Sequence, residues 1–263
     1  MVKPYIGVTG ITKAEQAEAL LSLMRPGSKR KLMIGVLASR RTLAGGRSDF
    51  APERYPCLED ITDIFPFHSN ALNLVHYNTK TVQFFEELAE VHYLAGPYFD
   101  GFQLNICWPS AVEIKRYHDW VDNGNRATGL FMPLPHKTIV LQIGARALQE
   151  IESSPAKLVQ RLNDYRGLVH SVLIDPSGGQ GKMLDVGAAG NYLRAIRNVY
   201  PGLALGVAGG LSPSTLPRIR PLVDEFCDLS IDAEGRLRDE NDKLHLGVAG
   251  LYVKDSINLF ANS

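Results

Sequence analysis

The residues with the clearest capacity for chemistry lie in Leu173–Lys182, LIDPSGGQGK, where an apolar run ends in Asp175 and a glycine-rich stretch follows. If the run is a strand of a parallel sheet, Asp175 stands at its C-terminal end, where ligand sites gather. Burial there raises the pKa of a carboxyl group and suits it to general acid or base work. The alternative is that Asp175 caps a turn through Pro176 and Ser177.

Two glycine-rich turns are candidate anion sites. Leu205–Pro213, LGVAGGLSP, places Gly209 and Gly210 between an apolar run and a Ser-Pro pair that opens a helix. Paired glycines let backbone N–H groups approach an anion, and a helix N-terminus adds a positive dipole. The alternative is a tight turn without a ligand. Gly179 and Gly181 resemble a phosphate loop in composition, although their spacing is not that of a Walker P-loop.

Two further pairs of polar residues are candidate substrate contacts. Arg40 and Arg41 follow an apolar run, and a guanidinium there can clamp a carboxylate bidentately, although arginines in polar loops are usually solvated. Gln103 and Asn105 alternate, which places them on one face of a strand. Two amides inside a barrel indicate either a polar core layer or a ligand contact. His76, within an apolar run, is interpreted as a hydrogen-bonded barrel residue.

The composition excludes several classes of function. Three cysteines without CxxC or Cys/His spacing indicate neither a disulfide framework nor a metal site, and no motif indicates a cofactor. The 28 basic and 28 acidic side chains balance, which argues against a nucleic-acid partner. No run of 18 apolar residues and no signal-peptide layout is present, so we expect no membrane partner and a cytoplasmic protein that binds a small molecule.

Short apolar runs that alternate with amphipathic stretches must position these residues. The runs are continuous rather than alternating, as in parallel strands buried on both faces. The sequence predicts strands at Tyr5–Val8, Leu32–Ala38, Ala71–Tyr77, Gly101–Ile106, Thr138–Ile143, Ser171–Ile174, Ala204–Ala208 and Asp228–Ile231. It predicts helices at Lys13–Met24, with Thr12 as N-cap, and at Thr81–Leu94, Ser110–Val121, Ala145–Leu162, Ala188–Val199, Ser214–Phe226 and Val253–Ala261, with a weaker candidate at Leu58–Phe65.

Eight such repeats specify either a closed barrel or an open doubly wound sheet. The 263 residues match the usual size of a barrel, and no GxGxxG follows the first strand. The predicted fold is therefore α/β, a single (β/α)8 TIM barrel over residues 1–263. Loops that follow strands form its working face, so Ser39–Pro56 and Glu234–Gly250 are expected to shape or cover the pocket. Asp122–Lys137 follows a helix and is expected at the opposite end.

Read in order, these pieces resemble the phosphoribosylanthranilate isomerase family. GVTGIT at 7–12 is similar to the family's K-I-C-G-I-T, and AGGLSP at 208–213 to its A-G-G-L-x-P. Asp175 with GGQGKMLD at 178–185 is similar to L-D-x…G-G-x-G-K-x-x-D. Looser similarities are SRR at 39–41 to S-x-R, FQLNI at 102–106 to V-Q-L-H-G, and GLYVKDSINLF at 250–260 to G-V-K-D-P-x-K-I.

The resemblance implies an Amadori rearrangement of an aminated ribose phosphate. It implies an aspartate at the end of strand six as general acid, the position of Asp175, and a cysteine of the first strand as general base. Thr9 stands at the position of that cysteine, and a hydroxyl without a neighbouring base is too weakly basic to replace a thiolate. We therefore expect little or no turnover of phosphoribosylanthranilate.

The phosphate site also departs from the pattern of the family. The family ends its last strand with D-V-S-S-G-V-E, whose amides hold the phosphate, whereas residues 228–234 read DLSIDAE. Ser230 matches a serine of that motif, but Asp232 replaces the glycine, and its carboxylate repels a phosphate. Asn105 stands where histidine is common in the family.

Together these features predict a divergent enzyme that acts on a sugar-like or carboxylate-bearing small molecule. Asp175 is the expected general acid or base, and Thr9 occupies the second catalytic position. The alternative is a non-catalytic barrel that retains a ligand pocket for a binding or regulatory role. The expected substrate-binding residues are Arg40, Arg41, Gln103, Asn105, Gly179, Gly181, Gly209, Gly210, Ser230 and Asp232.

Overall fold

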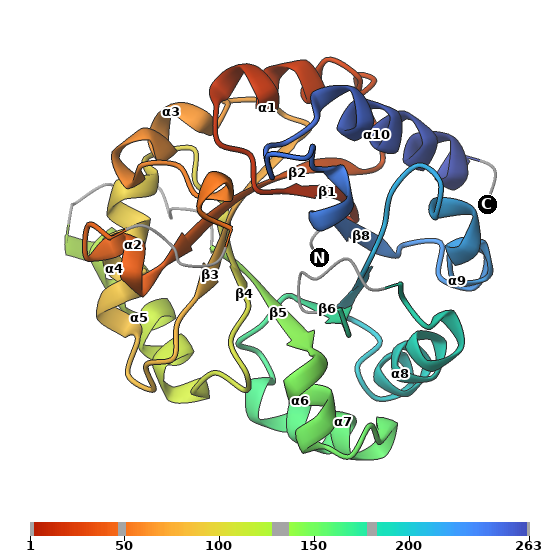
Figure 1. The fold of residues 1–263 in the computed structure, drawn as a ribbon. Helices are drawn as coiled ribbons and strands as arrows, with labels where there is room; N and C mark the ends of the chain where they lie inside the picture. The colour runs from red at the N-terminus through yellow and green to blue at the C-terminus, as the bar shows by residue number, and fades with distance from the viewer. Residues whose placement is uncertain (1–2, 47–50, 128–136, 178–182, 262–263) are drawn as a thin grey trace.

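Eight parallel strands close a barrel in chain order, because each strand pairs with the next and the last pairs with the first (Figure 1). The structure, a computed structural model, describes residues 3–46, 51–127, 137–177 and 183–261. The strands are β1 Tyr5–Thr9, β2 Lys31–Ser39, β3 Ala71–Asn78, β4 Gly101–Leu104, β5 Thr138–Gly144, β6 Ser171–Asp175, β7 Ala204–Ala208 and β8 Ser230–Ala233. The predicted (β/α)8 fold is confirmed.

The helices surround this ring, and α10 lies beside α1 where the two ends of the barrel sequence meet (Figure 1). The α-helices are α1 Ala14–Leu21, α2 Arg40–Leu43, α3 Ile61–Ile64, α4 Phe85–Ala95, α5 Ala111–Ala127, α6 Ala145–Glu150, α7 Pro155–Leu162, α8 Val186–Val199, α9 Arg220–Glu225 and α10 Leu246–Ala261. Short 3-10 helices are η1 Pro52–Arg54, η2 Leu58–Asp60, η3 Asn163–Tyr165, η4 Leu216–Ile219 and η5 Gly235–Leu237. Among the described residues, no helix is both long and apolar enough to cross a membrane.

The core has two parts, one between the strands and the helices and one inside the barrel. Successive residues of a strand point to opposite faces, so residues two apart share the barrel interior. Leu74, Val140 and Leu173 belong to the inner apolar cluster, and two residues later in each strand stands a polar side chain. The barrel interior is therefore apolar toward the N-terminal ends of its strands and polar at their C-terminal ends.

The longest predicted helix, Ala145–Leu162, is two helices in the structure. Pro155 occupies the first position of α7, where its missing N–H costs nothing, and the Ser154 hydroxyl accepts a bond from the N–H of Lys157 at 3.3 Å. Glu152 and Ser153 take positive φ values of 55° and 54° at the break. The apolar spacing continues through this break, so periodicity alone indicates one helix.

Other helix boundaries also differ from the sequence predictions. Thr12 is not an N-cap, because α1 begins after Lys13, and the Thr12 N–H instead donates to Gln16 Oε1 at 3.0 Å. The predicted helix Ser214–Phe226 divides into η4 and α9, and the weak candidate Leu58–Phe65 into η2 and α3. Helix α10 starts seven residues earlier than expected, and α5 extends into the predicted connection Asp122–Lys137. Residues 128–136 of that connection lie outside the described residues.

Two strand boundaries matter for the site. Strand β8 is Ser230–Ala233 rather than Asp228–Ile231, because Asp228 lies in a turn that the Leu229 N–H closes on the Phe226 carbonyl oxygen at 2.9 Å. This shift carries Asp232 into the strand, opposite Gly7 and Ala208. Strand β4 ends at Leu104, before Asn105.

Candidate functional site

Six polar side chains from six different strands gather at the C-terminal end of the barrel. Each is at most 6% exposed. Three of them stand two residues after a member of the inner apolar cluster, and all six lie at the ends of barrel strands, so the barrel itself brings them together. They are Thr9 of β1, His76 of β3, Gln103 of β4, Gln142 of β5, Asp175 of β6 and Asp232 of β8.

Hydrogen bonds link most of these groups into one chain across the barrel. The Thr9 hydroxyl lies 2.9 and 3.0 Å from the two carboxyl oxygens of Asp232 and donates to them. Gln103 Nε2 donates to Asp232 Oδ2 and to Gln142 Oε1, both at 3.0 Å. Gln142 Nε2 then donates to Asp175 Oδ2 at 2.7 Å. Two amides therefore connect two buried carboxyl groups.

Asp175 has both of the roles that its sequence context suggests. Its Oδ1 accepts bonds from the N–H and the hydroxyl of Ser177, at 3.0 and 2.6 Å, and so caps the turn after β6. Its Oδ2 faces the barrel and accepts from Gln142. The bonds from Ser177 to Oδ1 therefore fix the orientation of the Asp175 carboxyl group, and its Oδ2 belongs to the polar chain.

Burial sets the protonation of the two other ionisable groups here. It raises the pKa of Asp232 to about 7, although the hydrogen bonds from Gln103 and Thr9 favour the charged form, and the negative charges of Glu234 and Asp175 raise it further. Burial also lowers the pKa of His76, against the influence of Glu234 and Asp175. Near neutral pH the Asp232 carboxyl group is thus partly protonated, while the lowered pKa of His76 favours its neutral imidazole.

Small residues on β1 and β2 make room for the contact between Thr9 and Asp232. A Cβ atom at Gly7 would lie 2.6 Å from Asp232 Oδ1, and one at Gly35 would lie 2.5 Å from Thr9 Oγ1. Any larger residue at either position would displace the pair. The glycine of GVTGIT at position 7 is therefore part of the site.

The segment that follows β8, which includes Glu234, Arg238 and Asp242, covers the C-terminal mouth of the barrel. Arg238 donates to the carbonyl oxygen of Thr9 and to that of Gly10, the latter at 3.0 Å. Gly10 has φ +84°, and a Cβ atom there would lie 2.0 Å from Arg238 Nη2. Arg54 of η1 binds the same segment through Glu234 at 2.6 Å and Asp242 at 2.6 Å. The two loops expected to cover the pocket are joined by these ion pairs.

A cavity of about 20 Å³ remains beneath this cover, which is room for about one water molecule. Asp175 and Gly209 line the same cavity, as does Asp232, which bonds Thr9. The expected gathering of Thr9, Asp175 and Gly209 in one mouth is thus observed. The wall includes His76, Gln142, Ser177, Gly210, Glu234 and Arg236.

The glycine turn after β7 has the backbone that paired glycines permit. Gly209 and Gly210 have φ values of +120° and +61°. Their carbonyl groups are engaged, since Gly209 O accepts from the N–H of Leu184 at 3.2 Å and Gly210 O from the Thr215 hydroxyl at 2.8 Å. Glu234 shares the cavity with this turn, so an anion bound here would face a carboxylate.

The remaining candidates do not join the polar chain. Arg40 is at the rim, 2.5 Å from the Thr81 hydroxyl and 3.7 Å from Glu87, and Arg41 is exposed. Asn105 lies beyond the end of β4 and lines a separate pocket of about 540 Å³. Asn105 follows the last residue of β4, where its N–H still bonds the carbonyl oxygen of Tyr77 at 3.0 Å, so of the predicted pair only Gln103 joins the polar chain.

Ser230 is buried and accepts a bond from the N–H of Tyr5 at 3.1 Å, a contact between neighbouring strands β8 and β1. Gly179 and Gly181 lie outside the described residues. Within the described residues, no group of three His, Cys, Asp or Glu side chains could hold a metal ion.

Sequence reasoning missed Gln142 and understated His76. Both stand two residues after an inner apolar residue, Val140 and Leu74 respectively. His76 Nδ1 lies 3.5 Å from Gln103 Nε2 and lines the cavity, so its barrel position also places it at the site. Gln142 and His76 can be identified in the sequence as polar residues near the end of a predicted strand, two positions after an apolar residue that faces the barrel interior.

Replacing Thr9 with valine tests how the hydroxyl acts on Asp232. We expect Thr9→Val to raise the pKa of Asp232 further, because a hydrogen bond that favours the carboxylate is lost. Titration of the carboxyl carbon resonances by NMR measures the change. Thr215→Val, which removes a buried hydroxyl bonded to a carbonyl oxygen, should leave this pKa unchanged. An unaltered or lowered pKa in Thr9→Val would contradict the assigned contact.

The sequence matches no protein-family model and no curated protein. Solved structures do share its fold. Phosphoribosyl anthranilate isomerase from Thermus thermophilus superposes with a TM-score of 0.62 at 15% identity, over 97% of this chain and 99% of that one. The isomerase from Thermococcus kodakaraensis gives 0.57 at 13% identity, over 98% and 100% of the two chains.

A barrel enzyme of another name is also similar. Tryptophan synthase subunit alpha from Legionella pneumophila superposes with a TM-score of 0.56 at 13% identity, over 99% of this chain and 94% of that one. Identities this low establish a likeness of fold. The resemblance to phosphoribosylanthranilate isomerases that the motifs predicted is therefore confirmed as a resemblance in fold over nearly the full chain.

Proposed function

We propose that the barrel mouth is an acid–base site that transfers a proton on a small polar molecule, with Asp232 as the base and Asp175 as the acid. The contact between Thr9 and Asp232 carries this proposal. Thr9 stands where the resemblance implies a basic cysteine, and Asp232 stands where it implies a glycine. Thr9 and Asp232 are hydrogen-bonded, so the two differences from the family pattern occur at one place. We propose that the Asp232 carboxylate there replaces the missing cysteine base.

The protonation of Asp232 supports this role. A general base works best when its pKa is near the working pH, and burial brings the pKa of Asp232 to about 7. The carboxylate accepts a proton from a carbon next to a carbonyl or imine group. Asp175, oriented by Gln142 and Ser177, is proposed to gain a proton as the substrate covers it and to donate that proton to an oxygen of the substrate. Gln103 joins the two carboxyl groups through Gln142.

The proposed substrate is sugar-like, because amide, hydroxyl and imidazole groups line the mouth and its carboxyl groups disfavour an anion. The cavity of about 20 Å³ admits only the reacting atoms. Binding of a whole substrate then requires displacement of the segment held by Arg54 and Arg238. Glu234 and Asp232 disfavour a phosphate at Gly209, so turnover of phosphoribosylanthranilate is expected to be slight.

A non-catalytic barrel is the second candidate function. The observation that favours it is the closed mouth, in which the oxygens of Asp175 and Asp232 all accept hydrogen bonds within the protein. Under this alternative the polar chain holds the barrel together and a ligand binds elsewhere.

Deuterium exchange separates the two candidates without knowledge of the product. The protein is incubated in D₂O with aldoses, ketoses, their phosphates and 2-keto acids, and NMR follows incorporation at the carbon next to the carbonyl. We expect exchange into at least one compound. Asp232→Asn should slow it by at least about 100-fold, because positioned acid–base groups contribute this much or more. Asp224→Asn, a partly exposed residue of α9, is the matched control.

The outcomes discriminate clearly. Exchange that Asp232→Asn leaves intact would assign the base to another residue. The absence of exchange with every compound, in protein shown to be folded, would favour the non-catalytic barrel. Rapid turnover of phosphoribosylanthranilate would overturn the expected effect of Glu234 and Asp232 on a phosphate.

A further inference from the structure

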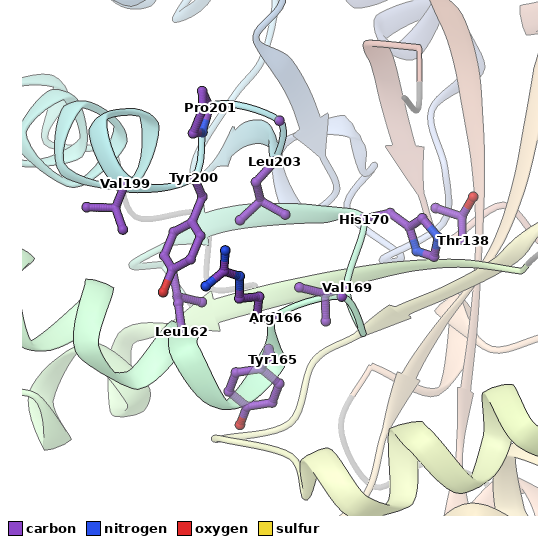
Figure 2. Close-up of a pocket in the computed structure, with 12 residues that line it drawn as sticks. Thr138, Leu162, Tyr165, Arg166, Val169, His170, Val199, Tyr200, Pro201 and Leu203 are labelled. Atoms are coloured by element: carbon purple, nitrogen blue, oxygen red, sulfur yellow. The ribbon is translucent and has the colours of Figure 1, made fainter.

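We propose that the N-terminal end of the barrel carries a second small-molecule site, which binds an aromatic carboxylate through Arg166. A pocket of about 610 Å³ lies there, in the range typical of small-molecule sites. Its walls are the connections that precede β6 and β7 (Figure 2). Thr138 opens β5, while His170 and Leu203 immediately precede β6 and β7, so the pocket is at the opposite end of the strands from Asp232.

The charges of the pocket favour an anion. Its lining contains Arg166 and His170, and none of the described residues that line it is acidic. Arg166 is exposed and makes no ion pair within the described part of the chain. A guanidinium presents two parallel N–H groups, which match the two oxygens of a carboxylate.

His170 supplies a second polar group in a defined tautomer. Its Nδ1 accepts a hydrogen bond from the N–H of Ile139 at 3.1 Å. A neutral ring with this contact carries its proton on Nε2. His170 lies with Thr138 on one side of the pocket, and Val199 lies on the other (Figure 2). An anion can thus be held by Arg166 while the rest of the ligand extends toward apolar groups.

Apolar and aromatic side chains form those remaining walls. Leu162 is buried, Val169 and Leu203 are partly buried, and Val199 remains 53% exposed although it is apolar. The Tyr200 ring is held in place, because its hydroxyl bonds Asn163 Oδ1 at 2.7 Å.

The orientation of the guanidinium selects the class of ligand. In Figure 2 the Arg166 side chain turns toward the side where Tyr200 and Leu203 lie. A flat apolar body against these groups covers surface that now faces water, which favours binding. A carboxylate attached to that body reaches Arg166. A small inorganic anion contacts only the arginine and leaves the apolar walls uncovered, so it should bind more weakly.

Binding of naphthalene-2-carboxylate tests the site. Titration into ¹⁵N-labelled protein should give saturable shifts at Gly167, Val169 and Leu203. Naphthalene-2-carboxamide, which has the same shape without the charge, and inorganic phosphate, which has charge without the apolar body, should each bind at least about tenfold more weakly. Arg166→Ala should weaken carboxylate binding by about tenfold or more, since it removes a charge-assisted pair.

Two further variants make the test specific. Arg161→Ala removes a neighbouring partly exposed arginine that does not line the pocket, and affinity should stay within about twofold. Val199→Glu adds a carboxylate to an exposed wall position and should weaken binding as Arg166→Ala does. The proposal is overturned if no probe saturates, if the carboxamide binds equally well, or if Arg166→Ala has no effect. Deuterium exchange at the mouth is independent of all these outcomes.

Discussion

Relative to wild type, the Asp232→Asn variant should gain stability as the pH rises from 4 to 8. The folded-state pKa of Asp232 is raised to about 7 by burial, whereas the carboxyl group of an unfolded chain titrates near 3.9. Between these values the folded protein binds a proton that the unfolded chain has lost, so the contribution of Asp232 to stability falls as pH rises. The fall is complete above pH 7 and amounts to about 4 kcal/mol from this group.

Urea unfolding of wild type and Asp232→Asn at several pH values measures this effect. The difference in free energy of unfolding should move in favour of the variant across pH 4 to 7, because asparagine has no charge to bury. Using the difference cancels groups that titrate in both proteins. Asp224→Asn on α9 should show no such trend. A difference independent of pH would mean that Asp232 titrates normally in the folded protein.

Replacing Gly101 with alanine should destabilise the barrel by more than about 4 kcal/mol, at the upper end for single substitutions. Gly101 opens β4 with φ +151°, and a Cβ atom there would lie 1.9 Å from the carbonyl oxygen of Thr138 in the neighbouring strand. The obstacle is backbone, so no side-chain rotation relieves it. Strand β4 carries Gln103, so the polar chain at the mouth should be lost as well.

Gly202 is the matched control for this substitution. A Cβ atom there meets nothing within 4 Å, and its φ is not in the left-handed region. Gly202→Ala should therefore be neutral or stabilise slightly, by up to about 1 kcal/mol, through the unfolded chain. Thermal and urea unfolding measure both variants. Equal stability of Gly101→Ala and wild type would show that β4 and β5 do not approach as closely as described.

The two ends of the barrel differ in a way that bears on function. The end that carries the buried carboxyl groups is covered, with Arg238 on the carbonyl groups of Thr9 and Gly10 and room for about one water below. The other end has the pocket of about 610 Å³ beside Arg166. In most (β/α)8 enzymes the loops after the strands hold the ligand. If both proposals hold, a substrate displaces the cover at one end while the other end binds a separate molecule.

Several features were predictable from the sequence because they depend on local physics. Continuous apolar runs alternating with amphipathic stretches predicted the eight strands and the barrel. The position of Asp175 after an apolar run predicted its place at the mouth, and the Gly209-Gly210 pair allowed the tight turn that is observed after β7. Boundaries were less accurate where a proline broke an apolar period, as at Pro155.

The tertiary structure decided which of these residues meet. Thr9 and Asp232 are 223 residues apart, and Gln103 and Asp232 are 129 apart, yet both pairs are hydrogen-bonded. Strand phase indicates which face a side chain occupies, but the register of each strand and the closure of β8 onto β1 determine its partners. The sequence alone thus identified Thr9 and Asp232 as two unrelated departures from a family pattern. Barrel closure makes them one hydrogen-bonded pair, and burial within that barrel gives Asp232 its raised pKa.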